Sequence, residues 1–396
     1  MTRVRRQTGP RAPRAFAVLV SVVATTVLLV GCGNDGYHPA GPFRPLPEGA
    51  PPEVGPPSSS APRPDVPAQP GAGEEDGDPN VVASGLAVPT GLVVLADGTA
   101  IVGERDTGRL LQVFPDRAPA RVLMRVPVDT SGDGGLLGLA VSPTYAEDGL
   151  LYAYVSTATD NRVVRFPLGG TPNPVLTGIP RGATHNGGGL LFAADGNLLV
   201  GTGDTGNAAL GRNPASLAGK VLRIDVFGHP VGRSVVFSRG FQDVAALCRS
   251  GAQAVYATDD GGRAGDELNL VVGGADYATV APLVRAPADE GGWAGCAAAG
   301  GLAAGAGAGT GGGAVFLGAL DGKRVHAVTL DDTGAVSGKP EEFLADRYGR
   351  LRSVALDADG ALWITTSNKD GVGTPGKEDD RVLRIQPPST AGSSPL

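Results

Sequence analysis

One unit recurs along the chain and constrains its fold more than any other feature. Each copy has a turn, often Asp-Gly, then a short apolar strand, a polar loop and a second strand of the type Arg-Val-x-Arg-Ile. Asp-Gly between apolar runs is a strong hairpin signal, because glycine readily takes a positive φ angle. The copies cover residues 96–113, 147–166, 194–203 with 219–225, 252–271, 313–330 and 358–385.

The spacing of this repeat selects among the all-β architectures. The first three Asp-Gly pairs begin at residues 97, 148 and 195, and a spacing of about 50 residues is that of a propeller blade of four strands. A β-solenoid would need shorter repeats, and a pair of β-sandwiches would not give six copies of one unit. Helical periodicity is nearly absent, which argues against a doubly wound sheet. The sequence therefore predicts an all-β, six-bladed β-propeller over residues 80–386.

The first 32 residues have the pattern of an export signal. Residues 1–14 hold five arginines and no acidic residue, an apolar run covers 15–30, and Cys32 follows Gly31. This order is typical of a secretory signal, and its end resembles the bacterial lipobox, which implies cleavage after residue 31 and a lipid on Cys32. A transmembrane anchor is the alternative, although the apolar run is shorter than the roughly 20 residues that a span needs. We expect a lipoprotein held at the extracytoplasmic face of the bacterial cell membrane.

Composition divides the rest of the chain and excludes one class of partner. Residues 32–79 are rich in Pro, Gly and Ser and have almost no large apolar side chains, so they predict a disordered tether. Residues 387–396 are expected to form a disordered tail. The formal charge of −7 becomes −12 once the five arginines of residues 1–31 are removed. An acidic chain with no basic cluster argues against binding of nucleic acid.

Two cysteines remain besides Cys32, namely Cys248 and Cys296. An even number of cysteines in an oxidising compartment suggests a disulfide. Two buried free thiols fit the sequence equally well, and only the geometry can decide between the two.

His185 is a titratable residue in an otherwise bare loop, within GATHNGGGLLFAADGNLLVGTGD at residues 182–204. Glycines 187–189 remove side chains beside it, so that a flat ligand could approach the backbone closely. An imidazole can accept a proton near neutral pH. In a propeller such a loop opens at the mouth of the central channel, which makes His185 a candidate general base. A capping histidine in a surface turn is the alternative.

Four segments, in order along the chain, carry a resemblance to a known family. They are LLGLAVSPTY (136–145), THNGGGLLFAADGNLLVGTGD (184–204), GDELNLVVGGADY (265–277) and GRLRSVALDADGALWITTS (349–367). They resemble the motifs of the PQQ-dependent sugar dehydrogenases, the glucose/sorbosone dehydrogenase family of six-bladed propellers, from about residue 85 to 385. The resemblance implies pyrroloquinoline quinone (PQQ) and Ca²⁺ as cofactors, a sugar as substrate, and an external electron acceptor.

The resemblance also implies roles for single residues. His185 would take the hydroxyl proton of the sugar while a hydride passes to the quinone. PQQ carries three carboxylates and an ortho-quinone, which suit guanidinium groups. The residues placed toward PQQ are Asp133, Asn186, Gln242, Arg350 and Arg352. Ca²⁺ prefers several oxygen ligands of mixed kind. Its ligands would be the carbonyls of Gly261 and Gly262 together with Glu267 and Tyr277.

The chain departs from the family pattern in the part that faces the cofactor. Gln242, Asp243 and Asp321 stand where the family has Arg, Asn and Lys. A neutral amide stabilises a developing negative charge less than a guanidinium does, and a carboxylate opposes it. A second hypothesis therefore stays open, a non-catalytic propeller that binds carbohydrate or protein. A metal-dependent lactonase on a similar propeller is a third.

Overall fold

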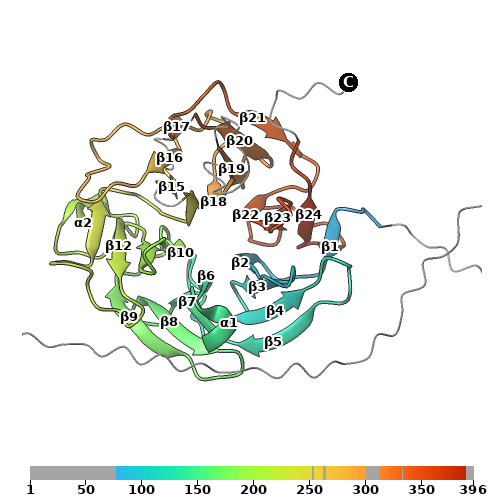
Figure 1. Cartoon of the computed structure of the whole chain (residues 1–396), viewed down its shortest axis with the longest axis horizontal. Helices are drawn as coiled ribbons and strands as arrows, with labels where there is room; N and C mark the ends of the chain where they lie inside the picture. The colour runs from blue at the N-terminus through green and yellow to red at the C-terminus, as the bar shows by residue number, and fades with distance from the viewer. Residues whose placement is uncertain (1–76, 252–253, 262–264, 300–312, 332, 389–396) are drawn as a thin grey trace, which may run out of the picture. The chain divides into compact units, whose positions relative to one another are not determined.

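A computed structural model describes residues 77–251, 254–261, 265–299, 313–331 and 333–388. Six four-stranded antiparallel sheets form a ring around a central axis (Figure 1), so the predicted six-bladed β-propeller is confirmed. Cys32, the signal segment, most of the tether, Gly262 and residues 389–396 lie outside the described part. In the described part, helix is confined to α1 (Tyr145–Asp148) and α2 (Ala208–Arg212). No helix there is long and apolar enough to cross a membrane.

Each blade starts at the axis and adds its strands outward. The innermost strands are β2 (Pro89–Val94), β6 (Leu136–Val141), β10 (Leu190–Phe192), β14 (Ala246–Ser250), β18 (Trp293–Ala299) and β22 (Leu351–Leu356). The second strands are β3 (Ala100–Glu104), β7 (Leu150–Ser156), β11 (Leu198–Gly201), β15 (Ala254–Asp259), β19 (Ala314–Ala319) and β23 (Leu362–Thr366). The third strands are β4 (Arg109–Val113), β8 (Asn161–Pro167), β12 (Lys220–Ile224), β16 (Glu267–Leu270), β20 (Val325–Thr329) and β24 (Val382–Ile385). The outermost strands are β5 (Arg121–Arg125), β9 (Asn173–Ile179), β13 (Val236–Arg239), β17 (Val284–Arg285), β21 (Glu341–Phe343) and β1 (Val81–Ala83).

The last blade closes the ring with strands from both ends of the fold. β1 comes from the N-terminal side and pairs with β24, with Val81 opposite Leu383. The outer edge of β24 is thereby paired with the first strand of the described part. This pairing ties the two ends of the propeller together and leaves only short outer edges, which is how such folds limit edge pairing.

The Asp-Gly pairs lie where the repeat predicted them, at the hairpins between first and second strands. Gly98 joins β2 to β3 and Gly196 joins β10 to β11, with φ angles of +81° and +78°. Each preceding aspartate closes its own turn, because Asp97 Oδ1 accepts the amide of Thr99 and Asp195 Oδ1 accepts the amide of Asn197. A residue with a Cβ would be strained at either glycine.

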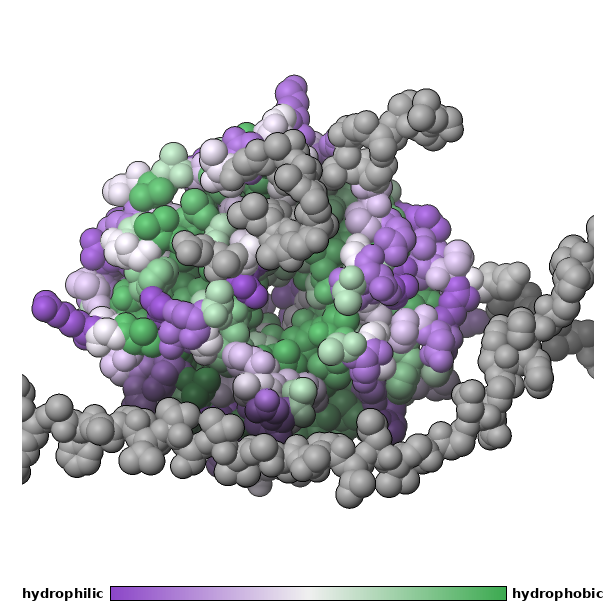
Figure 2. Space-filling model, in the orientation of Figure 1, coloured by the Kyte–Doolittle hydropathy of each residue, from purple (hydrophilic) through white to green (hydrophobic). Residues whose placement is uncertain are grey.

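The innermost strands pack closely around the axis because several of their residues are glycine. A Cβ on Gly138 would lie 1.9 Å from the carbonyl oxygen of Gly188, and one on Gly295 would lie 1.9 Å from that of Arg352. The strands leave a cavity of about 80 Å³ between them. Figure 2 shows the ring from the side of Figure 1, with a small opening near its centre.

The innermost strands of two neighbouring blades are joined covalently. Cys248 on β14 and Cys296 on β18 form a disulfide, with Cα atoms 5.7 Å apart, a separation normal for such a bond. Both residues are buried in one apolar cluster. Of the two alternatives that the sequence left open, the structure therefore has the disulfide.

Replacing both cysteines with alanine is expected to destabilise the propeller. The bond closes a loop of 48 residues in sequence separation, for which chain entropy in the unfolded state corresponds to about 4 kcal/mol. Chemical denaturation of the double variant should show a lower midpoint and a slope that is equal to or steeper than that of the parent, because the unfolded chain without the bond is less compact. A midpoint equal to that of the parent protein would mean that the bond does not constrain the unfolded chain.

Candidate active site

The loops at one face of the ring carry the predicted base and several charged side chains. In an antiparallel blade, the start of the first strand, the end of the second and the start of the third lie at the same face. His185, Asp243 and Arg350 precede innermost strands, whereas Asp204 and Asp260 follow second strands. Residues far apart in the sequence are therefore brought to one mouth of the propeller.

His185 is held in one orientation by a buried carboxylate. Its Nδ1 lies 2.9 Å from Oδ1 of Asp204, and the Asp204 side chain is 4% exposed against 28% for His185. The carboxylate accepts a hydrogen bond from Nδ1–H, which leaves the lone pair on Nε2. No described residue bonds to Nε2. The ring thus presents a proton acceptor to the open mouth.

The loop around His185 is fixed by its neighbour Asn186. Tyr154 donates its hydroxyl to the Asn186 carbonyl at 2.7 Å. The Asn186 side chain accepts from Gly182 N and Asn161 Nδ2 and donates to the Gly182 carbonyl. The Asn186 amide is thus used to hold the loop, and a contact of Asn186 with a cofactor stays a prediction. The loop keeps His185 at a φ of +53°, an uncommon value for a residue with a side chain.

The acidic residues around His185 raise its pKa above the usual 6.5. Burial alone lowers the pKa, but the hydrogen bond to Asp204 and the charges of Asp243 and Asp260 outweigh that effect. All of these groups favour the imidazolium form. A base of this kind takes up a proton more strongly than a free imidazole does.

Three carboxyl groups of the fourth blade have a pKa of about 7. Burial is the first cause for Asp243, Asp259 and Asp266 alike. The charge of Asp260 adds to it for Asp243 and Asp266, and that of Asp243 adds to it for Asp259. Each also accepts backbone hydrogen bonds, for example Asp243 from Gly187 N at 2.7 Å. The mouth therefore holds negative charge that the described residues only partly neutralise.

The two predicted arginines have different surroundings. Arg350 is buried and forms ion pairs with Asp321 and with Asp370, whose carboxylate lies 2.8 Å from Nε. Arg352 donates only from Nε, to Ser367 Oγ at 3.3 Å, and its terminal nitrogens bond to no described residue. Burial and the charge of Arg105 lower the pKa of Arg352. Arg352 is thus a partly buried cation that can still receive an anion.

Asp243 links the arginine side of the mouth to the histidine side. It interacts electrostatically with both His185 and Arg352. Asp243 is also the residue that stands where the family has asparagine. The three groups therefore share one space, although they come from three blades.

The predicted calcium ligands line a cavity beside the mouth. Glu267, Tyr277, Gly261, Asp259 and Gln242 all border a space of about 360 Å³. The Tyr277 hydroxyl donates to the carbonyl of Leu270 and accepts from the Val272 amide. The carbonyl, not the hydroxyl, is therefore the oxygen that Tyr277 can offer.

Within that cavity the carboxylate of Glu267 forms an ion pair with Arg285 at 2.7 Å. Gly261 has to be glycine, because a Cβ there would lie 2.1 Å from the Gly265 carbonyl oxygen. Gln242 borders the cavity, and its backbone amide donates to Asp259. Asp133 is exposed in the loop before β6, and its amide donates to the Ala183 carbonyl beside the His185 loop.

Sequence reasoning did not assign Asp204, Asp260 or Asp370 to the site. Each follows the second strand of its blade, as in the Thr-Gly-Asp after β11. The signal that could have found them is an acidic residue at that position in several repeats. Their contacts with His185 and Arg350 link different loops, so no spacing in the sequence revealed them.

Known proteins resemble this chain over nearly the whole propeller. The PQQ-bound aldose sugar dehydrogenase from Streptomyces coelicolor is 35% identical, has a TM-score of 0.71, and matches over 77% of this chain and 96% of its own. The quinoprotein glucose dehydrogenase B of Acinetobacter calcoaceticus is 26% identical over 58% of each chain. An uncharacterized protein of Synechocystis is 28% identical over 73% of this chain and 84% of its own.

This chain belongs to the class of propeller sugar dehydrogenases, which are oxidoreductases. Its six blades and the similar proteins both support this class. Residues 86–374 match the Glucose / Sorbosone dehydrogenase family, and the chain belongs to that family.

Proposed function

We propose that this protein oxidises an aldose or a related sugar alcohol group with PQQ, and passes the electrons to an external acceptor. The observation that carries the proposal is that His185 and Arg352 lie in the same mouth. A fixed imidazole with an open Nε2 and a guanidinium with open terminal nitrogens both interact with Asp243 in one mouth. This arrangement suits a planar anionic cofactor bound beside a base.

Arg352 is the group of the mouth that fits the negative charge of PQQ. The open nitrogens of Arg352 suit a carboxylate or a quinone oxygen. When bound, PQQ supplies an ortho-quinone that accepts two electrons from the sugar. His185 accepts the hydroxyl proton of the sugar at Nε2, and Asp204 stabilises the imidazolium that forms.

Ca²⁺ fits the acidic side of the same mouth. Its proposed ligands are the carboxylate of Glu267 and the carbonyls of Tyr277, Gly261 and Gly262. Asp259 and Asp266 nearby have raised pKa values because burial and neighbouring acids oppose their charge. A divalent cation bound there would offset that repulsion.

Gln242 and Asp243 are the residues that favour the second hypothesis, a non-catalytic propeller that binds carbohydrate or protein. With a pKa of about 7, the carboxyl of Asp243 is partly protonated at neutral pH, so it opposes an anion less than an ordinary aspartate would. Arg352 supplies positive charge in the same space. These two facts support retention of cofactor binding.

We further propose that the protein is exported and held at the extracytoplasmic face of the membrane through a lipid on Cys32. The order of arginines, apolar run and cysteine in residues 1–32 supports this placement. Mass spectrometry of the membrane fraction would show a lipid on an N-terminal Cys32, and an unmodified Met1 would contradict the proposal.

Reconstitution tests the enzymatic proposal directly. The purified protein is incubated with PQQ and Ca²⁺, and reduction of an electron-accepting dye is followed with a panel of aldoses. We expect turnover that requires both additions. Failure to bind PQQ at micromolar concentration would favour the binding module.

The Asp204→Asn variant should shift the pH dependence of kcat/KM. A general base works in its deprotonated form, so the activity of the parent is lost as the pH falls through the raised pKa of His185, above 6.5. Removal of the charge moves that limb to lower pH, because the asparagine amide oxygen can still accept from Nδ1 but no longer stabilises the imidazolium as a carboxylate does. It also lowers kcat by about 10-fold or more, because that stabilisation of the protonated base is lost.

A matched control exists on the outer turn of the third blade. There Asp225 pairs with the exposed His229 at 3.0 Å, so Asp225→Asn removes the same kind of contact away from the mouth. An unshifted profile in Asp204→Asn, or an equal shift in Asp225→Asn, would contradict the role given to Asp204.

A further inference from the structure

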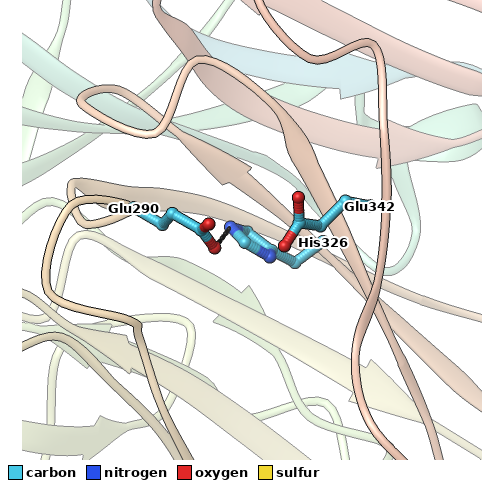
Figure 3. A group of neighbouring side chains, drawn as sticks. All are labelled: Glu290, His326 and Glu342. Atoms are coloured by element: carbon cyan, nitrogen blue, oxygen red, sulfur yellow. Dashed lines mark ion pairs between the residues drawn. The ribbon is translucent and has the colours of Figure 1, made fainter.

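A second histidine lies in a cluster outside the mouth described above. His326 lies on β20, Glu342 lies opposite it on β21, and Glu290 comes from the loop before β18. One donor atom from each of the three lies within 4.8 Å of the others. Figure 3 shows the imidazole between the two carboxylates. The cluster belongs to the outer part of the fifth blade.

His326 is buried and has an unused nitrogen aimed into this cluster. The residue is 1% exposed, and its Nε2 has no hydrogen-bond partner. Oε2 of Glu290 is also buried and unpartnered, and it lies 3.8 Å from Nε2. The pair is too far apart for a hydrogen bond. Two such buried polar atoms side by side are uncommon in folded proteins and call for a shared partner.

The charges around the cluster favour a cation as that partner. Arg324 bonds to Oε1 of Glu290 and to Oε2 of Glu342, which orients both carboxylates. Burial and the charge of Glu342 raise the pKa of Glu290, so the two carboxylates oppose each other where a cation would relieve the repulsion. Asp289 and Asp346 add negative charge, acting on Glu290 and Arg324 respectively. Four acidic groups thus surround one arginine.

We propose that His326, Glu290 and Glu342 bind a divalent zinc ion. Zn²⁺ takes imidazole nitrogen and carboxylate oxygen together, whereas Ca²⁺ and Mg²⁺ take oxygen ligands. Two ligands at about 2.0–2.1 Å from one tetrahedral Zn²⁺ lie roughly 3.4 Å apart, whereas Nε2 of His326 and Oε2 of Glu290 lie 3.8 Å apart. No two of the three donor atoms are more than 4.8 Å apart, so binding has to draw the side chains together by roughly 0.4 to 1.4 Å. Arg324 then acts as the outer partner that orients the ligating carboxylates.

The site would brace the loop that leads from the outer blade to the mouth. Glu290 is followed by Gly291, Gly292 and Trp293, whose amide donates to Asp266 at 2.6 Å. The Trp293 indole donates to the Glu290 carbonyl, and its ring lies 5.4 Å from the His326 ring. Zinc binding therefore fixes Glu290 to β20 and β21. Trp293 lies beside this site, so its fluorescence can report the binding.

Zinc titration of the full chain in excess Ca²⁺ tests the proposal. Calorimetry should give one tight Zn²⁺ site, together with a higher melting temperature and a change in tryptophan emission. In Glu342→Gln, which alters an exposed side chain, and in His326→Gln, affinity for Zn²⁺ should fall by 100-fold or more. His229→Ala, which removes an exposed histidine paired with Asp225, should keep the site.

Circular dichroism of each variant checks that it folds. If the variant His326→Gln, which changes a buried residue, does not fold, Glu342→Gln alone still tests the site. Absence of Zn²⁺ binding to the parent at 10-fold excess would overturn the proposal. An affinity that is unchanged in Glu342→Gln, or lost equally in His229→Ala, would also overturn it.

Discussion

His185→Ala is expected to reduce kcat by about 10²- to 10⁴-fold, the contribution usual for a positioned general base, and to leave PQQ bound. The side chain contacts the mouth through Nε2 alone, because Nδ1 is held by Asp204. Its loss removes the proton acceptor without removing Arg352 or the proposed calcium ligands. Steady-state dye reduction gives kcat, and equilibrium dialysis gives the affinity for PQQ.

His229→Ala is the control for this variant, since His229 is exposed and pairs with Asp225 far from the mouth in its blade. It should behave as the parent in both assays. Undiminished turnover in His185→Ala would remove His185 from the chemistry, whatever the affinity for PQQ.

Arg352→Gln is expected to weaken PQQ binding by about 10- to 150-fold. Hydrogen bonds to a charged group contribute about 1.5–3 kcal/mol, and the terminal nitrogens of Arg352 are open to receive an anion. Glutamine keeps much of the side-chain length but removes the charge. Titration of the folded variant with PQQ, followed by its absorbance, measures the change.

Arg350→Gln separates binding from stability. Arg350 is committed to Asp321 and to the buried Asp370, so its loss leaves the Asp370 carboxylate without its charged partner, although two backbone amides still donate to it. We expect a lower free energy of unfolding, of about 3 kcal/mol, and a smaller loss of PQQ affinity than in Arg352→Gln. If the order of the two affinities were reversed, the assignment of the two arginines would have to be exchanged.

The fold could be predicted because its determinants are local and repeated. Asp97-Gly98 and Asp195-Gly196 specify hairpins through their own backbone preferences, and six copies of the same unit specify six blades. The disulfide could only be offered as an alternative, since pairing of Cys248 with Cys296 depends on how neighbouring blades pack.

The site could be predicted only in part, because its chemistry depends on contacts between blades. The resemblance placed Arg350 and Arg352 alike toward PQQ, but Arg350 precedes β22 and the pairing of β22 with β23 shifts register after Leu351. The orientation of His185 by Asp204 and the pKa of Asp243 likewise arise from groups that approach only in the folded chain.

The central claim is that the mouth around His185 carries out sugar oxidation with a bound quinone. The most direct measurement mixes the protein loaded with PQQ and Ca²⁺ with an excess of aldose, without oxygen or dye, and follows the quinone absorbance. We predict that the parent rapidly loses quinone absorbance, by an amount that corresponds to one quinone for each bound PQQ. In His185→Ala almost no absorbance should be lost. A PQQ-loaded parent whose absorbance does not change with any aldose would contradict the account.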